Sequence, residues 1–231
     1  MFKNVFIFVR NAMYQAVTRT TGKRPFKNTQ KPIILNSKNL KRYQTSDRLD
    51  WDTAMNLVSR LYRDGDYTYA LLVGCGCFFG LRISDLLSLR WDMLIGKEKF
   101  TLREMKTGKR REIVINETFR ATIQACHDSL GVKNDSLPCF LTAQGNIPAT
   151  QTVNRNLKKI KEKYRLPIQH FSTHTFRKTF GYRVFTRAGD NAELALYKLS
   201  EIFNHSNTRV TRRYLGIRQD ELLATYNLLD E

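Results

Sequence analysis

Apolar residues recur along most of this chain at the helical spacing of three and four positions. From Asp50 to about Arg63, five apolar side chains fall on one face, and Asp50 is suited to cap the first turn. From Tyr67 to Phe79 the chain is apolar nearly all round, which predicts a buried helix that ends at Gly80. A short helix is then expected directly after Arg82, anchored by three leucines.

The pattern changes between Trp91 and Ile115, where short apolar and polar runs alternate around a Lys-Thr-Gly-Lys turn. This alternation predicts a small antiparallel sheet. The helical spacing then returns in six stretches, at about 117–130, 150–164, 175–187, 192–203, 207–214 and 219–229. The sequence therefore predicts a mostly α fold with one small antiparallel β-sheet, in the α+β class.

The start of the chain differs from the rest. Residues 5–17 have a helical period, and a loop rich in Thr, Lys and Pro follows to about residue 42. We expect two parts: residues 1–45 as a basic N-terminal helix and linker, and residues 46–231 as one globular domain.

The charge of the chain limits its partners. A formal net charge of +18 with a pI near 10 is too extreme for an ordinary metabolic enzyme and predicts a polyanionic partner, nucleic acid first. Residues 1–48 contain eleven Lys and Arg residues and one acid, so more than half of this charge lies there. The apolar run Val5–Val9 is far shorter than the roughly 20 residues that span a bilayer. It lacks a small-residue cleavage site, so we expect neither a membrane partner nor a signal peptide.

The four cysteines have no C-x-x-C spacing, and two of them lie in an apolar helical stretch. We interpret Cys75, Cys77, Cys126 and Cys139 as reduced core residues of a cytosolic protein, in preference to a zinc site or a disulfide framework. No metal is implied.

Six polar residues in the remainder of the chain could together cut a phosphodiester: Arg82, Lys106, His174, Arg177, His205 and Tyr214. Two guanidinium groups can hold the non-bridging oxygens of one phosphate, because their planar forks stay charged at any working pH. A tyrosine can attack that phosphate, and a lysine and histidines can move the protons, so the chemistry needs no metal or other cofactor. Each residue alone has an ordinary structural alternative, such as a surface salt bridge or a core aromatic contact.

The order and context of these residues resemble the tyrosine recombinase (phage integrase) family. The matching segments are Gly80-Leu81-Arg82-Ile83-Ser84-Asp85, Lys106-Thr107-Gly108-Lys109, His174-Thr175-Phe176-Arg177, and His205 nine residues before Tyr214. The resemblance covers about residues 45–231 well and 5–30 loosely. It implies the DNA breaking-rejoining catalytic fold for 46–231 and the end of a core-binding domain for 1–45, so we expect either a fragment or a naturally short recombinase.

The resemblance also implies a role for each residue. Tyr214 would attack the scissile phosphate to give a 3′-phosphotyrosyl bond and a free 5′ hydroxyl, which keeps the bond energy and needs no ATP. Arg82 and Arg177 would stabilise the transition state, Lys106 would protonate the leaving 5′ oxygen, and His174 and His205 would reach the same phosphate. Asp85, one helical turn beyond Arg82, is expected to orient a guanidinium.

Two features depart from the family pattern. Asn204 stands where the family usually has Gly before the histidine, although Asn can also adopt the left-handed backbone. The stretch between the second arginine and this histidine looks a few residues longer than usual, around Gly189 to Ala195.

The family works on double-stranded DNA as tetramers in which a C-terminal segment docks into a neighbouring subunit. Residues 219–229 could be that segment, or a helix packed on its own domain. We expect a site-specific DNA recombinase (integrase) of a mobile element, acting in the cytoplasm on the nucleoid. Two alternatives stay open: a type IB topoisomerase, and a DNA-binding regulator or inactive remnant.

Overall fold

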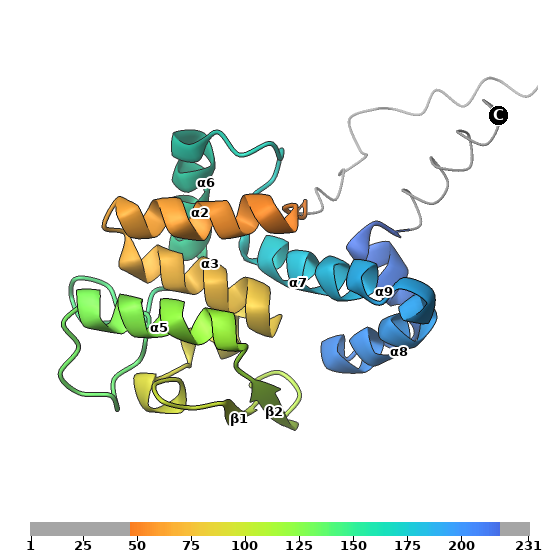
Figure 1. Cartoon of the computed structure of the whole chain (residues 1–231), viewed down its shortest axis with the longest axis horizontal. Helices are drawn as coiled ribbons and strands as arrows, with labels where there is room; N and C mark the ends of the chain where they lie inside the picture. The colour runs from red at the N-terminus through yellow and green to blue at the C-terminus, as the bar shows by residue number, and fades with distance from the viewer. Residues whose placement is uncertain (1–46, 218–231) are drawn as a thin grey trace, which may run out of the picture. The chain divides into compact units, whose positions relative to one another are not determined.

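The structure is a computed structural model that describes residues 47–217 (Figure 1). In chain order the elements are α2 (Trp51–Arg63), α3 (Tyr67–Phe79), α4 (Ile83–Leu87), η2 (Trp91–Met93), β1 (Lys99–Arg103), β2 (Arg110–Val114), α5 (Glu117–Ser129), α6 (Thr150–Tyr164), α7 (Thr173–Arg187), η3 (Gly189–Asn191), α8 (Ala192–Phe203) and α9 (Thr208–Leu215). The mostly α fold with a small antiparallel sheet is confirmed. The helices expected at 5–17 and 219–229 and the part expected at 1–45 lie outside the described residues, so the division of the chain at residue 45 stays a prediction.

Helix α3 forms the centre of the main core and lies between α2 and α5 (Figure 1). It is buried nearly all round, as its apolar sequence predicts. Two glycines allow the neighbouring helices to approach it closely. A Cβ at Gly74 would lie 2.4 Å from the ring of Phe119 on α5, and one at Gly76 would lie 2.7 Å from Phe176 on α7. The site residues that follow α3 and those on α7 are therefore held on one tightly packed frame.

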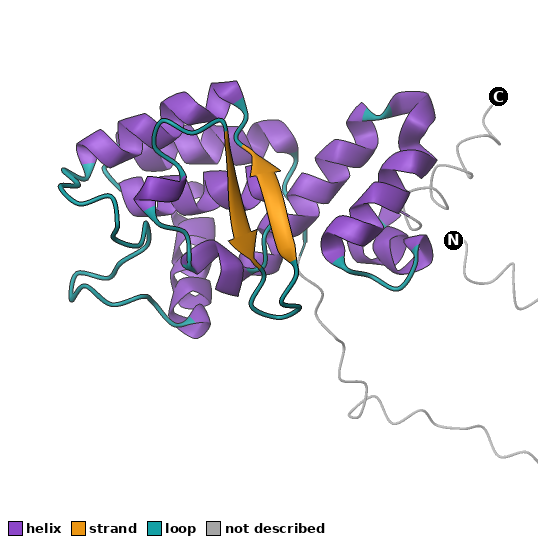
Figure 2. Cartoon of the chain, turned by 90° about the horizontal axis from the view of Figure 1, so that it is seen from below, coloured by secondary structure: helices purple, strands orange, loops and turns teal. Residues whose placement is uncertain are grey.

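The small sheet is a β-hairpin, shown as orange arrows in Figure 2. Strands β1 and β2 are antiparallel, with Lys99 opposite Val114 and Arg103 opposite Arg110. Phe100, Leu102 and Ile113 bury one face of this hairpin against the core. Residues 104–109 connect the two strands, and Gly108 takes a positive φ of 68° in this turn.

A second apolar cluster joins α7, α8 and α9. Its buried members are Leu196, Leu199, Phe203, Leu215 and Ile217. Gly181 on α7 makes the cluster possible, because a Cβ there would lie 2.7 Å from Leu215 and 2.9 Å from Phe203. Residues Gly189–Asn191, in the stretch expected to be longer than usual, form the short helix η3 that leads into α8.

The expected helix boundaries hold closely, with one informative exception. Asp50 caps α2, and α3 ends at Gly80 with a left-handed φ of 58°, both as predicted. Asn204 ends α8 with φ 52° and ψ 49°, so it does adopt the left-handed backbone. Helix α7 begins two residues earlier than expected, because the side chain of Ser172 caps it and Thr175 completes a capping box.

All four cysteines are buried, which confirms that they are core residues, and none of the four is paired in a disulfide. Among the described residues, no group of three or more His, Cys, Asp and Glu side chains is arranged to hold a metal ion. Between residues 47 and 217, no helix combines the length and the apolar character that crossing a membrane requires.

Candidate active site

All six side chains singled out in the sequence line one pocket of about 340 Å³. The pocket lies where the start of α4, the β1–β2 turn, the first turns of α7 and the α8–α9 connection meet. Its lining consists of Leu81, Arg82, Ile83, Ser84, Lys106, Thr173, His174, Arg177, Phe203, Asn204, His205 and Tyr214. Four segments far apart in the sequence thus contribute to one site.

Arg177 is the most buried cation of this pocket, with 5% of its surface exposed. Its Nη1 donates a hydrogen bond to the Gly80 carbonyl, and the guanidinium carbon lies 4.2 Å from the centre of the Phe203 ring. Burial lowers its pKa to about 10, so it remains charged at neutral pH. Its Nη2 is buried and has no hydrogen-bond partner among the described residues. A buried cation with an unused donor favours an anion in the pocket.

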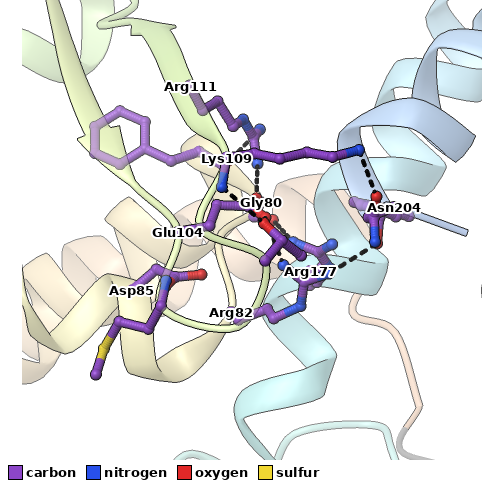
Figure 3. A network of polar contacts seen from close by, with 12 residues as sticks. Gly80, Arg82, Asp85, Glu104, Lys109, Arg111, Arg177 and Asn204 are labelled. Atoms are coloured by element: carbon purple, nitrogen blue, oxygen red, sulfur yellow. Dashed lines mark hydrogen bonds and ion pairs between the residues drawn. The ribbon is translucent and has the colours of Figure 1, made fainter.

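Arg82 lies just before α4 and is held from two sides (Figure 3). Its Nη1 donates to Glu104 Oε2 at 2.9 Å, and its Nη2 donates to the Phe203 carbonyl at 3.0 Å. Both guanidinium groups of the site are therefore oriented by fixed acceptors before any ligand binds. The Phe203 backbone and ring take part in holding both of them.

Glu104 is a member of this site that the sequence reasoning missed. Only 4% of its surface is exposed, and burial alone would favour its neutral form. Hydrogen bonds from Thr107 and Arg82, with the nearby charge of Arg111, nevertheless lower the pKa of its carboxyl below the usual value. The strand alternation carried a signal: Glu104 continues the buried positions 100 and 102 of β1. An acid in phase with a buried face indicates a partnered carboxylate.

Asp85 has a different contact from the one expected. It is fully buried, and its Oδ1 accepts a hydrogen bond from the backbone N–H of Met105 at 2.8 Å, while no hydrogen bond joins it to Arg82. Arg82 precedes α4, as predicted, with extended φ and ψ of −68° and 153°, and its carbonyl accepts a hydrogen bond from the Leu86 N–H of the first turn. Asp85 does lie one turn further on, but its carboxylate binds the hairpin backbone and not the Arg82 guanidinium. Glu104 is the carboxylate that orients Arg82, and Asp85 holds the backbone beside Lys106.

Lys106 had three basic neighbours in sequence that could have taken its place, and their contacts now separate them. The Lys109 ammonium donates to Asn204 Oδ1 at 2.8 Å, and Arg111 donates to the Phe79 carbonyl at 3.1 Å (Figure 3). Arg110 lines other hollows of the surface. Of these four, Lys106 alone lines the pocket with the two arginines.

The two histidines reach the pocket from different segments, His174 from α7 and His205 from the α8–α9 connection. His205 is fixed by Thr211, whose hydroxyl lies 3.0 Å from His205 Nδ1 and whose side chain is fully buried. Burial first, and then the charges of Arg177 and Arg82, lower the pKa of His205. His174 lies at the exposed rim, where loss of hydration and the charge of Lys178 lower its pKa. Both imidazoles are therefore neutral at pH 7.

Tyr214 places its hydroxyl inside the protein, where the oxygen is buried and has no hydrogen-bond partner among the described residues. Its ring packs edge-on against Phe203 at 5.6 Å and His205 at 5.3 Å between centroids. Burial raises the pKa of this phenol to about 12, and the charges of Arg177 and Arg82 oppose that shift. A neutral phenol thus lies within the electrostatic field of both guanidinium groups.

Comparison with known proteins shows the family to which this chain is similar. The model of the Phage integrase family matches residues 56–221. A relative named "Probable integrase/recombinase YoeC" from Bacillus subtilis (strain 168) is 32% identical over 148 residues, which cover 64% of this chain and 77% of that protein. Tyrosine recombinase XerC of Rickettsia peacockii (strain Rustic) is 30% identical over 148 residues, 64% of this chain and 46% of that protein.

The fold is also similar to a solved structure, the XerH site-specific recombinase bound to palindromic difH substrate in a post-cleavage complex. The TM-score is 0.60 at 16% identity, over 81% of this chain and 54% of that one. The chain spans about half the length of XerC and XerH. Because the family model covers well over half of its residues, the chain belongs to the phage integrase family.

Proposed function

We propose that this protein is a site-specific DNA recombinase that cleaves and rejoins DNA through a 3′-phosphotyrosyl intermediate. One observation carries the proposal: the Tyr214 phenol, Arg82 and Arg177 share a single pocket large enough for a backbone phosphate. The names of the relatives support recombination over a DNA-binding regulator or a relaxing topoisomerase.

The substrate we propose is double-stranded DNA. A scissile phosphate in the pocket would accept the unused Nη2 donor of Arg177 and further donors of Arg82. Both guanidinium groups are already fixed by Gly80, Glu104 and Phe203, so little reorganisation opposes their action in the transition state. The formal charge of +18 supports binding to the flanking phosphates, with a strong dependence on salt.

In the chemical step, the Tyr214 oxygen bonds to phosphorus while the bond to the 5′ oxygen breaks. With a pKa of about 12 the phenol enters the reaction protonated, and the neutral His174 imidazole accepts its proton. Lys106 donates a proton to the leaving 5′ oxygen. His205 donates from Nε2 to a phosphate oxygen, in the tautomer whose Nδ1 accepts a hydrogen bond from the Thr211 hydroxyl 3.0 Å away.

The phosphotyrosyl bond keeps the energy of the broken phosphodiester, so the 5′ hydroxyl of a partner duplex can attack it without ATP or another cofactor. We further propose that the protein acts as a homo-tetramer on DNA, joined through its C-terminal segment 219–229, and works in the cytoplasm on the nucleoid. The solved structure of XerH bound to its difH substrate supports DNA as a partner of this protein.

The test is a suicide DNA substrate, nicked near the cleavage site and built from the DNA that flanks the gene. The wild-type protein should form a covalent adduct that survives denaturing electrophoresis, and Tyr214→Phe should form none. Tyr197→Phe, at an exposed tyrosine of α8, is the matched control and should react like the wild type. Binding without an adduct by the wild-type protein would support the regulator. Relaxation of plasmids that lack two target sites would support the topoisomerase.

A further inference from the structure

We propose that Glu104 is a positioning residue that joins Arg82 to the turn carrying Lys106, and that Thr107 is its point of attachment to this turn. The inference rests on the proposed recombinase function. It assigns a role in the reaction to Glu104, a residue that lies outside the sequence motifs described above.

The geometry centres on one carboxylate oxygen. Glu104 Oε2 accepts a hydrogen bond from Arg82 Nη1 at 2.9 Å and a second one from the Thr107 hydroxyl at 2.7 Å. The other oxygen, Oε1, lies 3.6 Å from Arg111 Nη1. Figure 3 shows Glu104 between Arg82 and Arg111, and Glu104 lies at the turn end of the hairpin, directly after β1. One buried atom therefore connects a guanidinium of the pocket to the residue that directly follows Lys106.

The backbone of Glu104 closes the same turn. Its N–H donates to the Lys109 carbonyl at 2.9 Å, and its carbonyl accepts from the Gly108 N–H at 2.8 Å. The next residue, Met105, donates its N–H to the buried Asp85. The turn is thus fixed on both sides of Lys106 by two buried carboxylates.

Lys106 depends on this arrangement because its own side chain is not held. Its ammonium makes no hydrogen bond or ion pair with any residue between 47 and 217, and the side chain is exposed. A lysine has four flexible bonds, so the position of its backbone decides how often the ammonium reaches the leaving oxygen. Anchoring the turn to Arg82 fixes the backbone of Lys106 relative to the arginine that holds the phosphate.

A direct chemical role for Glu104 does not fit these contacts. Both of its oxygens are occupied by cations or a hydroxyl donor, and it does not line the pocket. A purely structural role would be to compensate the charges of Arg82 and Arg111. Such a role predicts a loss of folding stability without any selective effect on proton donation.

The experiment measures single-turnover cleavage of two suicide substrates, one with the natural 5′ oxygen and one with sulfur at that bridging position. A thiolate leaves without a proton, so the sulfur substrate does not need Lys106. Thr107→Val removes the hydroxyl donor but keeps the branched shape. We expect it to slow cleavage of the oxygen substrate by roughly tenfold, the scale of one hydrogen bond to a charged group. Cleavage of the sulfur substrate should stay within about twofold of the wild type.

Two further variants sharpen the result. In a Lys106→Ala background, Thr107→Val should cause no additional loss, because both changes remove the same proton donation. Glu104→Gln should slow cleavage of both substrates, because Arg82 also loses its partner. The loss of rate should be smaller for the sulfur substrate than for the oxygen substrate. Glu112→Gln, an exposed hairpin acid that pairs with Lys99, is the control and should change neither rate.

Equal slowing of both substrates by Thr107→Val, or full additivity with Lys106→Ala, would overturn the inference while leaving the recombinase proposal intact. Absence of a Tyr214-dependent adduct in the wild type would overturn both. Thr107→Val tests the connection even where Glu104→Gln does not fold, because it changes one partly buried hydroxyl.

Discussion

Replacing Gly80 by alanine should damage both the fold and the site, by amounts that can be worked from the geometry. Gly80 has a φ of 58°, a left-handed conformation that costs an L-residue about 1–2 kcal/mol. A Cβ there would also lie 2.3 Å from Cδ1 of Phe180 on α7, and overpacking of this kind costs about 1–3 kcal/mol. Gly80→Ala should therefore lower the free energy of unfolding by about 2–5 kcal/mol, a large share of the 5–15 kcal/mol typical of a domain.

The chain offers controls that separate these two costs. Gly65 also has a positive φ, 81°, but nothing lies within 4 Å of its missing Cβ, so Gly65→Ala should cost only the strain of about 1–2 kcal/mol. Gly76 lies inside α3 without a positive φ, and a Cβ there meets Phe176 at 2.7 Å, so Gly76→Ala should show mainly the overpacking. Urea unfolding followed by circular dichroism gives all three values. A Gly80→Ala protein no less stable than Gly65→Ala would refute the reasoning.

Activity provides a second measurement of the same change. The Gly80 carbonyl accepts the hydrogen bond that fixes Arg177, and Phe180 lies one turn further along the same helix. Moving α7 away from Gly80 shifts this guanidinium relative to Arg82. Under conditions where the variant remains folded, adduct formation should fall by tenfold or more, on the order of one lost hydrogen bond to a charged group. Full activity in folded Gly80→Ala would show that this anchor is not needed.

Three other changes test separate parts of the structure. Arg165 is exposed and left-handed at the end of α6, with φ 52°. Arg165→Gly should therefore raise the free energy of unfolding by about 1 kcal/mol, which the urea midpoint measures. Thr211→Val removes the partner of His205 and should slow adduct formation by roughly fivefold, the scale of one hydrogen bond. Because the pKa of His205 is lowered in the fold, the unfolded chain binds more protons as the pH falls through and below about 6.5. The free energy of unfolding should therefore fall as the pH drops below that value. Urea titrations across this range should show a smaller fall for the His205→Gln protein.

The sequence was sufficient where a signal is local. Apolar periodicity and capping residues predicted the positions of α2 and α3. The tendency of Asn to adopt the left-handed backbone predicted the conformation of Asn204. The early start of α7 was not predicted, because its capping box uses Thr175 in place of the usual Glu or Gln. These are interactions between neighbours in sequence, so the pattern itself contains the information.

Interactions between distant segments could not be read in this way. The choice of Lys106 over Lys109 depends on a contact of Lys109 with Asn204, 95 positions away. The carboxylate that binds Arg82 is Glu104, 22 positions away after β1, and helical spacing does not reveal this contact. Order and residue type predicted which side chains converge, whereas tertiary structure decides how each one is held.

The charges of the site bear on when Tyr214 could react. Burial keeps its phenol protonated, with a pKa of about 12, and the charges of Arg177 and Arg82 reduce this shift without removing it. A phosphate in the pocket would add negative charge and oppose the arginines, so it could not produce a free phenolate in advance. Proton removal must then accompany bond formation, which requires a neutral base at the pocket. His174, with a pKa lowered by lost hydration and by Lys178, satisfies that requirement at neutral pH. In the proposed reaction, attack by the tyrosine is therefore coupled to the state of this histidine, and the arginines contribute by stabilising charge on the phosphate.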